Sequence, residues 1–100
     1  MANKIMPHNI EAEQSVLGCV LIDNLAAAGI MAEITAEDFY AEAHKIIFEN
    51  MFNIYAKNKP IDFITVSNEL EKDNKTDSIG GIEYLSQLTN IVPSASNYKH

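Results

Sequence analysis

Among the residues that could do chemistry, a histidine in acidic surroundings comes first. His44 closely follows Glu37, Asp38 and Glu42. An imidazole and carboxylates together could ligate a metal ion, or the carboxylates could help the imidazole act as a general base. The spacing supports neither role, because the HExxH arrangement that places two histidines on one helix face is absent. We therefore expect His44 to be a capping or half-buried structural residue.

The single cysteine, Cys19, is the second candidate. It lies in an apolar run with helical spacing, and no basic residue stands near it in the sequence to stabilise a thiolate. One cysteine can form neither an internal disulfide nor a multi-thiolate metal site. We expect Cys19 to be a small core residue of a protein from a reducing compartment.

A glycine pair near the end of the chain could belong to a nucleotide-binding loop. Such loops bring backbone amides to phosphate oxygens and continue with Lys and Ser or Thr, whereas Gly80 and Gly81 are followed by Ile82 and Glu83. The pair is better suited to a hinge or a helix cap. The sequence therefore predicts no catalytic residue, no cofactor site and no metal site.

The charge of the chain constrains its partners. The formal net charge is −7, all seven cationic residues are lysines, and residues 1–50 hold eight acids against two lysines. Arginine, which is absent, supplies the bidentate fork that reads phosphates and guanines. We expect no direct nucleic-acid binding.

Composition indicates one small globular domain. The 100 residues are 47% hydrophobic and 21% charged, which is ordinary for a soluble chain that buries a core. No apolar run is long enough for a signal peptide or a membrane span. We expect a cytoplasmic protein without membrane contact.

Helical periodicity dominates the chain, and no alternating strand pair is present. The fold class is therefore predicted as all-α, a compact bundle of about six short helices. Residues 1–9 are expected to be a flexible arm, and Pro93 and Ser94 to end one helix and start another. The last expectation implies that a further helix has only begun when the chain reaches His100. The expected helical segments are 10–23, 24–34, 35–40 as a brief turn, 41–58, 61–73 and 82–92.

Local signals give the caps and the core of this bundle. Asn24 and Asp62 are expected to cap the helices that they precede, and Asn58 with Pro60 to end the longest one. Glu11 and Glu13 lie in a first turn, where the helix dipole favours acids. The expected core residues are Ala12, Val16, Leu17, Ile47, Phe48, Met51, Phe52 and Leu85.

A helix-turn-helix is one alternative for residues 63–92, which read as helix, polar turn, glycine and helix. A recognition helix should direct Arg, Lys, Asn or Gln toward bases. The helix at 82–92 offers only Gln87 and Asn90 and begins with an acid, Glu83. A plain helical hairpin is favoured.

Four stretches in this order and at these separations resemble one family. They are "NIEAEQSVLGCVLID", "EDFYAEAHKIIFENMFNIY", "KPIDFITVSNEL" and "IGGIEYLSQLTNIVPSASNYKH". Together they are similar to the N-terminal domain of DnaB-type replicative DNA helicases, and the resemblance covers residues 9–100.

The resemblance implies that residues 10–100 form the helical N-terminal, or collar, domain of a replicative helicase. In that family a helical hairpin, a linker and a RecA-like ATPase motor follow. The stretch "PSASNYKH" matches the entry to that hairpin, so the resemblance implies that the following helical hairpin is truncated at the C-terminus, His100. ATP and Mg²⁺ would belong only to the absent motor. The chain is then a fragment without enzymatic activity of its own, although the full-length protein would be an ATP-dependent DNA helicase.

The family's collar assembles by pairing of these domains, and it docks primase and some helicase loaders. The resemblance therefore implies primase as a partner, a loader as a possible one, and self-association, with a weak dimer here and a hexamer in the full-length protein. The alternative is a stand-alone acidic helical adaptor or regulator that binds a basic protein partner.

Two residues in the matched stretches are predicted to face a partner. Glu11, in "IEAEQ", is an acid at a helix start, and Tyr84, in "GGIEYL", is an aromatic of the kind that anchors interfaces. Each has a simpler interpretation. Glu11 would be a solvated N-terminal charge, and Tyr84 a core ring with its hydroxyl at the rim.

Overall fold

The structure, a computed structural model, describes residues 9–91, and within them the chain is entirely helical. The predicted all-α class is confirmed. The helix count differs slightly, since there are five α-helices and two 3₁₀ turns. The elements are α1 (Ile10–Ile22), α2 (Asn24–Glu33), η1 (Ala36–Asp38), α3 (Glu42–Ala56), α4 (Phe63–Lys72), η2 (Asp77–Ile79) and α5 (Ile82–Ile91).

Two predicted features fall largely or wholly outside the described residues. They are the N-terminal arm, of which only Asn9 is described, and the start of a further hairpin after Pro93. Within residues 9–91, no helix is both long and apolar enough to cross a lipid bilayer.

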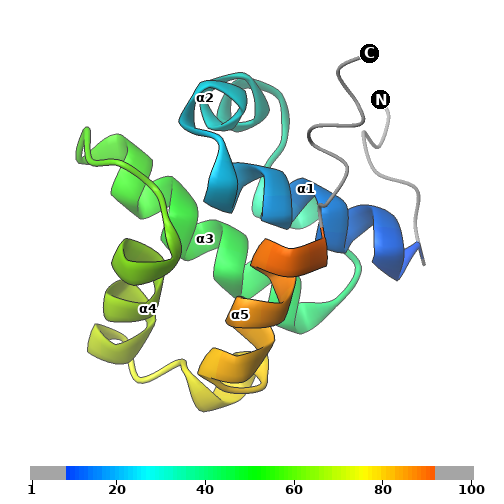
Figure 1. The fold of residues 1–100 in the computed structure, drawn as a ribbon, viewed down its shortest axis with the longest axis vertical. Helices are drawn as coiled ribbons and strands as arrows, with labels where there is room; N and C mark the ends of the chain where they lie inside the picture. Colours follow the sequence, from blue (N-terminus) through cyan, green and yellow to red (C-terminus); the bar gives the residue numbers. More distant parts are fainter. Residues whose placement is uncertain (1–8, 92–100) are drawn as a thin grey trace.

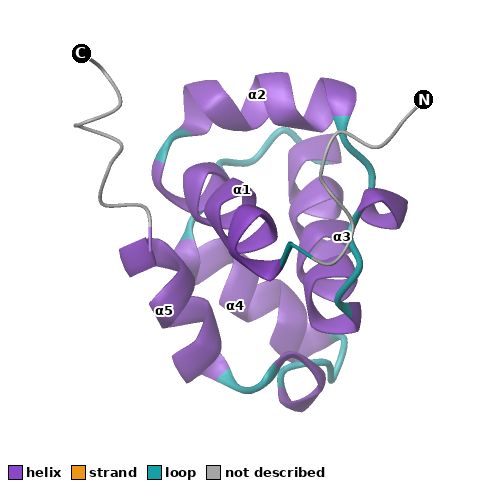
Figure 2. Ribbon diagram, turned by 90° about the vertical axis from the view of Figure 1, so that its right-hand side faces the viewer, coloured by secondary structure: helices purple, strands orange, loops and turns teal. Residues whose placement is uncertain are grey.

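The helices pack around α1 and α3. Helix α1 contacts α2, α3 and α5, while α3 contacts α4 and both 3₁₀ turns. Figure 1 shows α2 across one end of the molecule and η2 at the other, with α1, α3 and α5 between them. Figure 2 shows the same arrangement from the side. Side chains from five helices therefore meet in one core.

The core contains most of the residues predicted for it. Five of the predicted residues are buried, and Ala12 and Val16 are partly buried against the cluster. Phe52 is the wrong prediction, because 46% of its surface is exposed. The buried face of α3 passes through Ile47, Met51 and Ile54, and Phe52 lies beside that face rather than on it. The five buried residues are Leu17, Ile47, Phe48, Met51 and Leu85.

Helix caps follow local rules with one displacement. Asp62 caps α4 as predicted, its Oδ1 accepting the Thr65 N–H at 2.9 Å. Helix α2 is capped by Asp23 instead of Asn24, since Oδ1 of Asp23 accepts the N–H of the residues two and three positions on. Asn24 is freed for a tertiary role, and its Oδ1 accepts the Ile61 N–H at 3.1 Å.

The glycine pair forms the cap that the sequence predicted. Gly80 ends η2 with φ +99°, and Gly81 follows with φ +87°. A side chain is disfavoured in this region of backbone space. A Cβ on Gly80 would lie 3.4 Å from the Cβ of Tyr84, an ordinary van der Waals contact, so the backbone angle alone opposes a side chain. The pair thus sets the direction in which the chain enters α5.

We expect Gly80→Ala to destabilise the domain by about 1–2 kcal/mol, because alanine must adopt a left-handed conformation there. Gly29→Ala is the matched control, since a Cβ at that position in α2 meets nothing within 4 Å. It should stabilise the helix by up to about 1 kcal/mol. Urea unfolding followed by circular dichroism measures both changes, and equal stability of the two variants would contradict the assignment.

Candidate functional site

The N-terminus of α3 is capped by a residue of α1. The N-cap residue of α3 is Ala41, which has no side-chain acceptor. Glu13 supplies it, with Oε2 accepting the Tyr40 N–H at 2.7 Å and Oε1 accepting the Ala41 N–H at 3.3 Å. A carboxylate in this position also interacts favourably with the positive end of the helix dipole. Glu13 lies in the first turn of α1 as predicted, and its carboxylate also reaches the N-terminus of α3.

His44 connects this carboxylate to α5. Its Nδ1 lies 2.7 Å from Oε1 of Glu13, and its Nε2 lies 2.6 Å from the hydroxyl oxygen of Tyr84. Gln14 donates from Nε2 to the same hydroxyl at 3.0 Å. With the proton on Nδ1 donated to Glu13, Nε2 accepts from the Tyr84 hydroxyl. We call Glu13, His44 and Tyr84 the buried network.

The environment of Glu13 favours its ionised form. Burial by itself raises the pKa of the carboxyl group, but hydrogen bonds from His44 and from the backbone of Tyr40 and Ala41 outweigh it. The pKa therefore lies below its usual value. Because three donors converge on a side chain with 0% exposure, the charge is compensated where water cannot reach it.

The buried network has the residue types of a catalytic relay, but a substrate could not reach it. A carboxylate, an imidazole and a hydroxyl in series can activate a nucleophile, yet His44 is only 1% exposed. Among residues 9–91, no group of three His, Cys, Asp or Glu side chains could hold a metal ion. The arrangement instead joins α1, α3 and α5. His44 is a structural residue as expected, but fully buried rather than half-buried.

The two predicted partner-facing residues lie near each other on the surface of α1 and α5. Glu11 is exposed on α1, and Tyr84 is half-buried on α5. Gln14, which contacts the Tyr84 hydroxyl, is three positions after Glu11 and so lies on the same side of α1, one turn away. We call Glu11, Gln14 and Tyr84 the α1–α5 surface. Binding of a partner there stays a prediction.

The sequence carries a signal for the burial of Glu13 and His44. Glu13 precedes Leu17 and Val20 at i+4 and i+7, and His44 precedes Ile47 and Phe48 at i+3 and i+4. Each polar residue therefore continues the buried face of its helix. A polar residue in line with core positions is buried and needs a partner, although its spacing does not say which one.

Comparison with known proteins identifies the family. Residues 5–100 match the family described as "DnaB-like helicase N terminal domain". The chain belongs to this family. The crystal structure of the N-terminal domain of DnaB helicase from Mycobacterium tuberculosis superimposes with a TM-score of 0.84 at 36% identity. The match covers 91% of this chain and 65% of that one, so the DnaB N-terminal fold is shared as well.

Relatives named "Replicative DNA helicase DnaB" are much longer than this chain. The protein from Geobacillus stearothermophilus is 39% identical over 99 residues, which are 99% of this chain and 22% of that protein. The protein from Pasteurella multocida is 42% identical over 93 residues, 93% of this chain and 20% of that protein. The chain spans about a fifth of the length of these curated relatives. The resemblance to the DnaB N-terminal domain is confirmed.

We expect Glu13→Gln to remove a contribution to the free energy of unfolding that is present at neutral pH and lost in acid. With its lowered pKa, ionised Glu13 stabilises the folded state above its usual pKa of about 4.5. That contribution is lost as the pH falls through the lower folded-state pKa. The stability gap between parent and variant, about 1–3 kcal/mol or more at pH 7, should therefore shrink below about pH 4.5.

Urea unfolding at a series of pH values measures this gap. Glu11→Gln, at an exposed acid two positions earlier in α1, is the control and should cost less than about 1 kcal/mol, the usual size of an exposed helix-dipole interaction. A gap between the parent and Glu13→Gln that stays constant from neutral to acidic pH would contradict an ionised, buried Glu13.

We expect Tyr84→Phe to destabilise the domain by about 1–3 kcal/mol, because Nε2 of buried His44 loses its hydrogen-bond partner. Tyr55→Phe removes the same atom from a ring that is 40% exposed, and should change stability by less than about 0.5 kcal/mol. Thermal unfolding of both variants provides the comparison. Similar effects of the two changes would argue against the buried network.

Proposed function

We propose that this domain is a non-catalytic scaffold of a replicative DNA helicase, contributing to ring assembly and docking primase or a helicase loader. The observation that carries the proposal is the family match over residues 5–100. Relatives named as replicative DNA helicases, at 39–42% identity, support it. An ATP- and Mg²⁺-dependent motor is proposed for the part of those relatives that this chain does not cover.

Electrostatics favour a protein partner over DNA. A net charge of −7 without any arginine repels a phosphate backbone and lacks the side chain best suited to bind it. The same field attracts a partner with a basic patch and speeds their encounter. In an oligomer of this domain, each added copy would strengthen that attraction.

The α1–α5 surface is the proposed docking site. The hydroxyl of Tyr84 accepts a hydrogen bond from Gln14 and forms a second one with Nε2 of His44. The Tyr84 ring also lies nearly parallel to the His44 ring, with a centroid separation of 5.8 Å. A ring fixed in advance loses little conformational entropy when a partner covers it. Glu11 adds an exposed charge one helical turn from Gln14. Tyr84 would anchor the complex while Glu11 steers a basic partner.

Calorimetric titration with the helicase-binding domain of the cognate primase tests the proposal. We expect Glu11→Lys and Tyr84→Ala each to weaken binding by about tenfold, which corresponds to about 1.4 kcal/mol. Tyr84→Phe should retain most of the affinity, because the ring remains. Glu71→Lys makes the same charge change at an exposed position of α4 and should have little effect.

A longer version of the protein that includes the expected hairpin is titrated in parallel. Failure of both folded versions to bind would rule out primase docking and leave a loader or an architectural role. Binding that is unchanged by Glu11→Lys and Tyr84→Ala would place the docking site elsewhere.

A further inference from the structure

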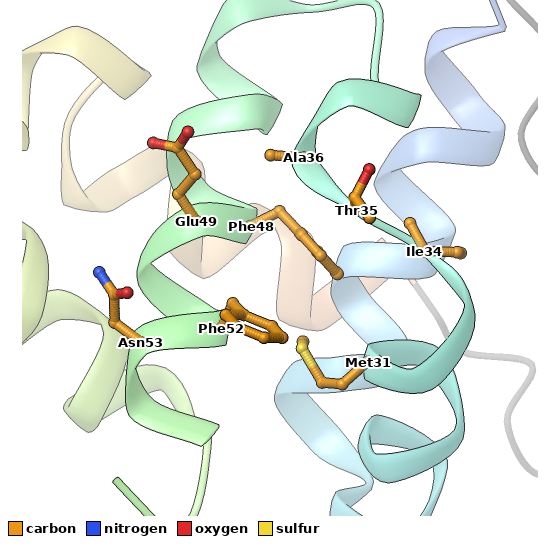
Figure 3. Close-up of a pocket in the computed structure, with 8 residues that line it drawn as sticks. All are labelled: Met31, Ile34, Thr35, Ala36, Phe48, Glu49, Phe52 and Asn53. Atoms are coloured by element: carbon orange, nitrogen blue, oxygen red, sulfur yellow. The ribbon is translucent and has the colours of Figure 1, made fainter. Parts of the chain in front are cut away.

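A groove with an apolar floor lies between α3 on one side and α2 with η1 on the other. Its volume is about 580 Å³, within the range of sites that accept large apolar groups. In Figure 3 the ring of Phe52 and the sulfur of Met31 approach each other across it. The lining residues are Met31, Ile34, Thr35, Ala36, Phe48, Glu49, Phe52 and Asn53.

Phe52, the exposed aromatic residue of this groove, is not part of the buried core. Phe52 is 46% exposed although its helix neighbours Phe48 and Met51 are buried. Its ring lies 6.3 Å from that of Tyr55, which is 40% exposed. Two partly exposed aromatic rings therefore lie side by side on α3, within one helical turn, where a partner could cover both.

The rim of the groove is acidic. Glu49 lines it directly, and the exposed acids Glu33 and Glu37 stand next in sequence to the lining residues Ile34 and Ala36. The eight lining residues include no lysine. An apolar floor with a negative rim is complementary to an apolar stripe flanked by positive charges.

We propose that this groove binds an amphipathic, basic helix of a partner protein. The helix rests a large apolar side chain on Met31 and Phe52 and places Lys or Arg beside Glu49. A helix is the fitting occupant because the described residues offer no sheet edge to which a strand could add, whereas two helices flank a groove that a third can enter. The inference is independent of the proposed helicase role, since the α1–α5 surface lies on other helices.

Fluorescence anisotropy with labelled peptides tests this groove. The probe is an amphipathic peptide of about 18 residues, about 27 Å as a helix, with Leu or Phe on one face and Lys and Arg on the other. We expect micromolar binding that weakens at higher salt. Phe52→Ala and Glu49→Lys should each weaken it at least tenfold, whereas Ile64→Ala and Glu71→Lys, which change an exposed apolar and an exposed acidic residue of α4, should not.

Circular dichroism and thermal unfolding establish that each variant is folded. Asn53→Arg, at an exposed lining position, is a second blocking variant that leaves Phe52 in place. The proposal would be overturned if the folded parent bound neither the Leu-containing nor the Phe-containing basic peptide. It would also be overturned if a peptide with Glu in place of Lys and Arg bound equally well. Sedimentation could instead show that the chain forms a dimer and that Phe52→Ala dissociates it. The groove would then be a contact between copies of the chain, and the proposal would be overturned.

Discussion

The carboxylate of Glu13 at the N-terminus of α3 is the interaction on which the arrangement of the helices depends. A buried charge is stable only where enough donors surround it, and here the donors are two backbone amides before α3 and the imidazole of His44. Those donors converge only when α1 and α3 lie in one relative position. Apolar packing alone tolerates small shifts between helices, so the polar contact adds specificity to a core that is otherwise held by burial.

The hydroxyl of Tyr84 carries this constraint toward the surface. Through His44, the orientation of α5 is linked to the start of α3 and to the first turns of α1. Gln14 contributes a further contact from the half-buried side of α1. An interface built on α1 and α5 would therefore be presented by helices whose positions are already fixed, which lowers the entropic cost of binding.

Helix α2 is not part of the buried network that joins α1, α3 and α5, and a groove separates it from α3. It packs on α1 and is tied to the loop before α4 by one hydrogen bond from Ile61 to Asn24. Between α2 and α3, Met31 and Phe52 both line this groove. The domain thus combines a buried polar network inside with an acidic exterior that contains an apolar groove.

The sequence by itself determined the features that depend on neighbouring residues. Helical period, the Asp62 cap and the glycine turn at Gly80 all follow from contacts within a few positions, and the ordered motifs were sufficient to recognise the family. Tertiary structure alone decided that Glu13 pairs with His44, 31 residues away, that Asn24 bonds to Ile61 instead of capping α2, and that Phe52 remains exposed. Partners so distant in the chain are selected by how the helices pack together, and the spacing within any single helix does not contain that information.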